Sequence, residues 1–237
     1  MARIYGHESN YIKGKRFNFR LHEYIILLAL IALIYWHTKV SSGVPKSLSE
    51  TLIIAVIFIG VIKLLSRRFY KEDRGYRRTG RGLKGEDEIV HELKKLPDEY
   101  SVFRNVSIHE GCDIDCIVVG PNGVFTIETK SHSGRIDFNG RELTLNGAPF
   151  LEKNVLAQAM GGAMDVHTFL REKLNREVFV TPILVFASKF VSIGLGMKPI
   201  HGVYVVQKSW LRECITQAGS ALQGIEDINK LLEGKSE

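Results

Sequence analysis

Charged residues inside an apolar strand pattern constrain this chain more than any other feature. Residues 113–130 read DIDCIVVGPNGVFTIETK, and the runs of β-branched residues on both sides of a Pro-Asn-Gly turn signal predict a β-hairpin. Because side chains alternate faces along a strand, Glu128 and Lys130 project from one face. The same alternation places Asp113 and Asp115 together. Charges are costly in apolar strands unless paired or used, so the pattern predicts one cleft that receives acidic groups from both strands.

Two carboxylates beside an ammonium suit a hard divalent cation. Mg²⁺ prefers oxygen ligands and keeps several waters for a phosphate substrate and a nucleophile. The plainer interpretation is a solvated ion pair, since a Glu-x-Lys triplet arises by chance about once in a chain of this length. The acidic residue on the preceding strand, Asp115, favours the metal site over that ion pair.

A helix is predicted before the hairpin, over residues 84–96. Its apolar residues recur at helical spacing, and Pro97 closes the segment. Glu86 then lies at the edge of the buried stripe and points toward the sheet. An acid in a first helical turn also complements the helix dipole, so that role remains open for Glu86.

A second hairpin is predicted after the first, from strands at 135–138 and 141–145. We expect a type I′ turn at Asn139-Gly140 between them. Residues 154–174 then carry apolar side chains at helical spacing, and Gln158 lies near the start of this helix. A glutamine there is ordinarily a surface residue, although it could also bond a phosphate or a metal-bound water.

The rest of the chain predicts an α/β fold. Residues 178–187 are nearly all apolar, as in a central strand that is buried on both faces, and residues 202–206 repeat that pattern. Helical segments follow at 209–217 and 225–232. Strands with intervening helices predict a mixed sheet with helices packed on it.

The first third of the chain has a different composition. Residues 24–36 are uninterrupted apolar, and residues 52–65 are apolar except for Gly60 and Lys63. With their flanks they predict two transmembrane helices at about 22–40 and 48–65, because a crossing needs about 20 residues. Buried helices or an interfacial hairpin are the alternative, since each strictly apolar core is short.

Basic residues set the expected orientation of these spans. They gather before the first span and, in larger number, after the second, whereas the loop between has only Lys39 and Lys46. The positive-inside rule therefore predicts a multi-pass membrane protein with both termini in the cytosol. The expected organisation is a membrane hairpin (1–66), a basic linker (67–84) that lies against anionic lipid, and a cytosolic domain (85–237).

Cysteine and histidine usage predicts no metal centre of the zinc type. The chain has three cysteines, which suits a reducing compartment, and no four-ligand zinc pattern. Cys112 and Cys116 share strand parity and face opposite to the two aspartates, so they are expected to be core residues rather than a zinc pair. His109 and His132 flank the acidic strands, but neither is assigned a role.

Several blocks of sequence resemble the NERD (nuclease-related domain) branch of the PD-(D/E)XK nuclease superfamily. The blocks are GLKGEDEIVHELKKLPDEYSVFRNV before the hairpin, DIDCIVVGPNGVFTIETKSHSGRI through it and KNVLAQA after it. The similarity runs from about residue 80 to residue 187. It implies a restriction-endonuclease-like mixed β-sheet flanked by helices, and metal-dependent hydrolysis of phosphodiester bonds.

The resemblance also implies individual roles. Asp115 and Glu128 match the metal ligands for Mg²⁺ or Mn²⁺, together with the backbone carbonyl of Thr129 and with Glu86 from the first helix. Lys130 matches the catalytic lysine and Gln158 the helix glutamine. One residue departs from the pattern, because Cys116 stands where the branch often has histidine.

The expected function is therefore a membrane-anchored nuclease acting on DNA, with RNA as another substrate and the lipid bilayer as a partner. Self-association through the spans stays open. The alternative is a non-catalytic membrane-tethered scaffold with a nuclease-like fold that binds nucleic acid or protein. An intact set of acids beside Lys130 favours the enzyme.

Overall fold

The computed structural model describes residues 1–6, 82–150 and 154–236. The predicted spans at 22–40 and 48–65, and nearly all of the basic linker, lie outside the described residues. Among the helices that are described, none is both long and apolar enough to cross a bilayer.

A six-stranded mixed sheet forms the centre of the domain, with the order β1-β2-β3-β4-β8-β10. The strands β2, β3 and β4 form an antiparallel meander, β8 runs parallel to β4 and β10, and β1 pairs in parallel with β2. The predicted hairpin and mixed sheet are thus confirmed. The bounds are β1 Arg3–Tyr5, β2 Ser101–His109, β3 Cys112–Gly120, β4 Gly123–Lys130, β8 Val180–Phe186 and β10 Tyr204–Gln207.

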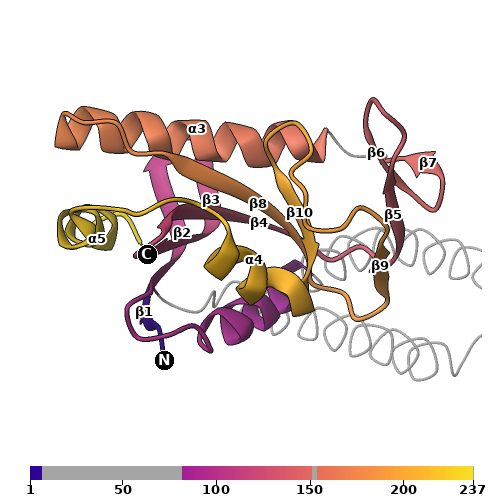
Figure 1. Cartoon of the computed structure of the whole chain (residues 1–237), viewed down its shortest axis with the longest axis horizontal. Helices are drawn as coiled ribbons and strands as arrows, with labels where there is room; N and C mark the ends of the chain where they lie inside the picture. The colour runs from indigo at the N-terminus through magenta and orange to yellow at the C-terminus, as the bar shows by residue number, and fades with distance from the viewer. Residues whose placement is uncertain (7–81, 151–153, 237) are drawn as a thin grey trace, which may run out of the picture. The chain divides into compact units, whose positions relative to one another are not determined.

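Helices cover both faces of this sheet (Figure 1). On one face lie α3 (Val155–Leu174) and α5 (Ile225–Glu233). The other face packs against the helix at 82–93 and against α4 (Leu211–Gln217), which follows the short 3₁₀ helix η1 (Lys208–Trp210). Because helices cover both faces of the sheet, every residue of β8 is buried, and all but Thr181 are apolar.

A small second sheet lies beside the first, with the order β7-β6-β5-β9. The predicted second hairpin is present. The predicted two-residue turn at Asn139-Gly140 is wrong, because Phe138 pairs with Leu143 across a four-residue loop. The side chain of Asn139 accepts hydrogen bonds from the backbone of Arg141 and Glu142, which favours this loop over a two-residue turn. The bounds are β5 Gly134–Phe138, β6 Leu143–Leu145, β7 Ala148–Pro149 and β9 Val191–Ile193.

The strands β2 and β3 change face in their middle. Along β3, Cys116 packs on the side of the 82–93 helix, whereas Ile114 packs on the side of α3 although it has the same parity. On β2, Asn105 has a φ of 49°, in the left-handed region. It lies between residues that pair with Cys116 and Ile114, so the alternation of faces shifts at this level in both strands. Cys112 and Cys116 are both buried in the core, as predicted, but the prediction that they share a face is wrong.

The hairpin of β3 and β4 is fixed to the end of α4. The side-chain amide of Asn122 in the turn donates to the carbonyls of Ile215 and Ala218, at 2.5 and 2.7 Å. Its carbonyl accepts from the hydroxyl of Tyr100 at 2.8 Å. The ring of Tyr100 lies against Gly120, where a Cβ atom would collide with the ring carbons.

We expect Gly120→Ala to lower the free energy of unfolding by about 1–3 kcal/mol, because a well-packed aromatic ring must move. Denaturant unfolding of the full-length protein, followed by circular dichroism, measures the change. Gly161→Ala in α3 is the matched control. A Cβ there meets no atom within 4 Å, so alanine should stabilise the helix by about 0.5–1 kcal/mol. Equal stability of the two variants would contradict the packing.

Candidate functional site

The site begins at a fork between β3 and β4. Backbone pairing of these strands extends from the turn to Cys116 and Ile127 and stops there. Beyond that point the backbone N–H of Thr129 donates to the carboxylate of Asp115 at 2.7 Å. A carboxylate oxygen of Asp115 thus replaces the backbone carbonyl that would accept from Thr129 if the strands continued to pair. This hydrogen bond holds the half-buried Asp115 of β3 against β4.

Glu128, Lys130 and Gln158 form a closed triangle of hydrogen bonds. The ammonium of Lys130 donates to Glu128 Oε1 at 2.9 Å and to Gln158 Oε1 at 3.0 Å. The Gln158 amide in turn donates to Glu128 Oε1 at 2.8 Å. The side chains of Glu128 and Lys130 are only 15% and 14% exposed, so α3 and β4 together fix the geometry of both charges.

Glu86 approaches the same place from the 82–93 helix. The preceding residue, Gly85, lets the helix come close to β4 and β8, since a Cβ atom at this position would lie 3.3 Å from Ala187 and 3.7 Å from Thr129. Buried Arg104 of β2 pairs with Asp87 at 2.6 Å and adds positive charge near Glu86. Sequence reasoning missed the role of Gly85, although a glycine beside three acids was a visible signal.

The three acids Glu86, Asp115 and Glu128 lie close enough to repel one another. Burial raises the pKa of Asp115 to about 7, with further contributions from the charges of Glu128 and Glu86, while the Thr129 N–H and Lys130 oppose the shift. Burial also raises the pKa of Glu86, helped by Asp87 and Glu128 and opposed by Arg104. A divalent cation would relieve this repulsion, so the donor set fits a hard metal ion.

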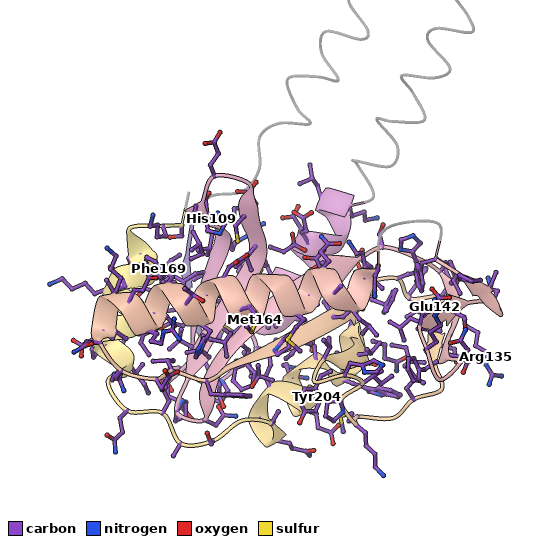
Figure 2. The ribbon with its side chains drawn as sticks, turned by 90° about the horizontal axis from the view of Figure 1, so that it is seen from above. His109, Arg135, Glu142, Met164, Phe169 and Tyr204 are labelled. Atoms are coloured by element: carbon purple, nitrogen blue, oxygen red, sulfur yellow. The ribbon has the colours of Figure 1, made fainter. Side chains whose placement is uncertain are left out.

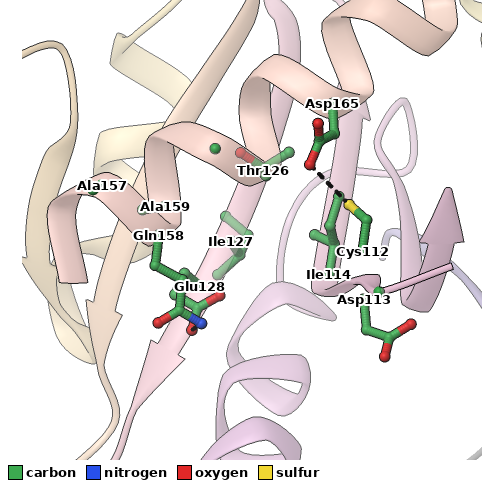
Figure 3. A pocket seen from close by; sticks show the side chains of 13 residues that line it. Cys112, Asp113, Ile114, Thr126, Ile127, Glu128, Ala157, Gln158, Ala159 and Asp165 are labelled. Atoms are coloured by element: carbon green, nitrogen blue, oxygen red, sulfur yellow. Dashed lines mark hydrogen bonds between the residues drawn. The ribbon is translucent and has the colours of Figure 1, made fainter. Parts of the chain in front are cut away.

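A pocket of about 240 Å³ opens between the fork and α3. Figure 3 shows Glu128 and Gln158 at one end of it and Cys112 and Asp165 at the other. Thr126 also lines the pocket, and its buried hydroxyl oxygen has no hydrogen-bond partner. The space is therefore lined by polar groups that could meet a ligand.

A compact group of three further side chains, all of types that can bind metal ions, lies at the second end of the pocket. The ligand atoms of His109, Cys112 and Asp165 all lie within 4.8 Å of one another. The Cys112 thiol donates to Asp165 Oδ2 at 3.1 Å, and His109 Nε2 lies 3.7 Å from Asp165 Oδ1. Figure 2, which looks onto α3, shows His109 beside this helix. Sequence reasoning missed the group because Asp165 lies 53 residues after Cys112.

The structure brings the predicted residues together with one exception. Asp115 and Glu128 share the fork, and Lys130 and Gln158 bond Glu128 directly. The exception is Asp113, which is exposed and does not share the buried setting of Asp115, because the faces of β3 change at Asp115.

Comparison with protein families matches residues 81–187 to NERD, the nuclease-related domain. The matched segment contains the fork, the triangle of hydrogen bonds and the 82–93 helix. Comparisons with curated proteins and with solved structures gave no significant match.

The raised pKa of Asp115 predicts a pH-dependent cost to stability. An acid whose pKa is higher in the folded state than its usual 3.8 stabilises the fold at low pH, and this contribution disappears as the pH rises through about 7. Asp115→Asn keeps an acceptor for the Thr129 N–H and removes the charge. We therefore expect the variant to be more stable than wild type at pH 8, by about 1 kcal/mol or more.

Thermal unfolding in chelator at pH 5 and pH 8 measures this difference. The advantage of the variant should shrink at pH 5, because Asp115 is then largely protonated in the folded protein and no longer repels Glu86 and Glu128. Asp98→Asn is the matched control at an exposed carboxylate. An Asp115→Asn variant that is less stable than wild type at pH 8 would refute the electrostatic account.

Proposed function

We propose that this chain is a metal-dependent nuclease that hydrolyses phosphodiester bonds in DNA, with RNA as the alternative substrate. The observation that carries the proposal is the convergence of Asp115, Glu128 and Lys130 at the fork of β3 and β4. The match of residues 81–187 to the nuclease-related domain supports it.

Asp115 and Glu128 would hold Mg²⁺ or Mn²⁺, together with Glu86 and the backbone carbonyl of Thr129. These are oxygen donors of the kind that such ions prefer. When bound, the ion supplies charge stabilisation for the phosphate and a more acidic water.

Lys130 is suited to hold the attacking water and to meet developing negative charge. Its ammonium is fixed by Glu128 and Gln158 rather than being free in solvent. A donor that is already oriented pays little reorganisation when charge develops. Gln158 acts as a positioning residue, since its carbonyl faces the ammonium and its amide N–H faces the carboxylate.

Lysines near Glu88 of the 82–93 helix are suited to contact a nucleic-acid backbone, although Lys208 pairs with Glu88 at 2.6 Å. A side-chain hydrogen bond from Lys208 lowers the pKa of Glu88, although slight burial opposes it, and the charges of Lys84 and Lys189 act in the same direction. These lysines come from three separate segments. Phosphates are bound by such clusters largely through electrostatic attraction and counterion release.

We also propose membrane attachment through the two predicted spans, with both termini in the cytosol. The pairing of β1 with β2 supports an even number of crossings. Residues 3–5 and the main part of the domain share one sheet, so they must lie on the same side of any membrane that the intervening chain enters.

A non-catalytic scaffold is the second candidate, and the triangle of hydrogen bonds favours it. Lys130, Glu128 and Gln158 satisfy one another, as a purely structural ion pair would. A scaffold would need neither a metal ion nor cleavage, which separates the two candidates experimentally.

We expect Lys130→Ala to reduce metal-dependent DNA cleavage by the full-length protein at least a hundredfold, because the oriented ammonium is lost. Cleavage of linear, circular and single-stranded DNA and of RNA, in Mg²⁺ or in chelator, measures the effect and identifies the substrate. Lys173→Ala, at an exposed lysine of α3, should behave as wild type. Equal cleavage by wild type and Lys130→Ala would refute the role of the lysine.

Mg²⁺ or Mn²⁺ should raise the melting temperature of the wild-type protein, since an ion that binds only the folded state stabilises it, by about 2.7 kcal/mol at a hundred times its Kd. Glu128→Gln should lose most of this response. Glu99→Gln, at an exposed acid, is the control. Metal stabilisation without any cleavage would favour the scaffold.

A further inference from the structure

We propose that His109, Cys112 and Asp165 form a second metal site, which binds one ion of the zinc class and fixes the tip of the β2–β3 hairpin to α3. This site is chemically distinct from the acidic fork. The proposal does not depend on nuclease activity.

The hairpin tip places two of the ligands side by side. Only Glu110 and Gly111 separate His109 from Cys112. After a shift in register at Ser107, His109 pairs with Cys112 across the two strands. Gly111 has a φ of 82°, which a tight turn requires and which glycine adopts without strain. Side chains opposite each other in a hairpin project from the same face, so the imidazole and the thiol both reach toward α3.

The third ligand comes from the pocket-lining side of α3. Gln158, Gly162 and Asp165 all line the pocket, and their spacing of four and three residues places them on one helical face. Asp165 lies seven positions after Gln158 in the helix, or about 10 Å further along the axis. The two ends of the pocket are thus separate sites on one helix.

The hydrogen bond of His109 involves Nδ1 and leaves Nε2 to bind a metal ion. Nδ1 lies 3.1 Å from the carbonyl oxygen of Glu110, and a carbonyl only accepts, so Nδ1 carries the proton. Nε2 then faces the Asp165 carboxylate, with Oδ1 3.7 Å away. A cation between these two groups would be bound by both, and a metal-binding histidine commonly has such a second hydrogen bond.

Cysteine-based catalysis does not explain the group. The Cys112 thiol donates to Asp165 and not to His109, so no base is placed to accept its proton in the order that a nucleophilic triad needs. A bound metal ion would hold Cys112 as a thiolate ligand, because a thiol that coordinates a metal ion is deprotonated.

The donor set and its spacing fit zinc better than magnesium. In a tetrahedral zinc site, bond lengths near 2.0 and 2.3 Å put a nitrogen and an oxygen about 3.3 Å apart, and a sulfur and an oxygen about 3.5 Å apart. His109 Nε2 lies 3.7 Å from Asp165 Oδ1, and Cys112 Sγ lies 3.1 Å from Oδ2 of the same carboxylate. Since the ligand atoms of the three residues lie within 4.8 Å of one another, they would have to move closer together to bind one ion. His109 and Asp165 are 59% and 41% exposed, which leaves room for water as a fourth ligand.

Titration of the full-length protein with Co²⁺ in a thiol-free reductant tests the site. We expect one Co²⁺ per chain with the absorption band of thiolate-to-cobalt charge transfer, displaced by Zn²⁺ and not by excess Mg²⁺. Cys112→Ala should lose the band. Asp165→Asn and His109→Gln alter partly exposed side chains and should fold normally, while weakening Zn²⁺ binding at least tenfold.

Cys214→Ala is the matched control, since this buried cysteine packs in the core on the other face of the sheet and should leave the band unchanged. Lys130→Ala and Glu128→Gln should also keep it, so that failure of the nuclease proposal and failure of this one remain distinguishable. The second site is refuted if wild type shows no thiolate band or if the band survives in Cys112→Ala. Unchanged Zn²⁺ affinity in both Asp165→Asn and His109→Gln would equally overturn it.

Discussion

The hydrogen bond from the Thr129 N–H to the Asp115 carboxylate is the interaction on which the site depends. Two antiparallel strands ordinarily continue to pair, which would leave no space between them for a ligand. Here the backbone partners stop at Cys116 and Ile127, and a side chain accepts the next N–H instead. The fork therefore opens without leaving a buried N–H unsatisfied, and its acid is held in place by the backbone of the other strand.

The same fork brings three acidic side chains close together, which lowers the stability of the fold when they are ionised. Burial raises the pKa of Asp115 and of Glu86, and the repulsion among these two acids and Glu128 raises the pKa of both further. Lys130 and Arg104 offset part of this repulsion. Sites at which unfavourable electrostatics persist in a well-packed fold are frequently functional, because stability is given up there for binding or reactivity.

Sequence reasoning found the elements of the domain because each has a strong local signal. The Pro-Asn-Gly turn, the apolar run of β8 and the helical spacing of α3 all appear as predicted, and Asn154 caps α3 by accepting from Leu156 and Ala157. Reasoning failed where local preference was overruled. Asn139-Gly140 suits a two-residue turn, yet the side chain of Asn139 stabilises a longer loop. Strand parity failed at Asp115, because a left-handed residue in the neighbouring strand shifts the faces of both strands.

The sequence by itself determined the mixed α/β fold and placed Asp115, Glu128 and Lys130 on the two strands of one hairpin, because periodicity and turn chemistry are local properties of the chain. It also determined that Glu128 and Lys130 share a face. Only the tertiary structure decided that Gln158 bonds both of them, that Gly85 admits Glu86 to the fork, and that Asp165 meets His109 and Cys112. Those contacts join residues that are far apart in the chain, and their geometry follows from how α3 and the 82–93 helix pack on the sheet, which no local pattern encodes.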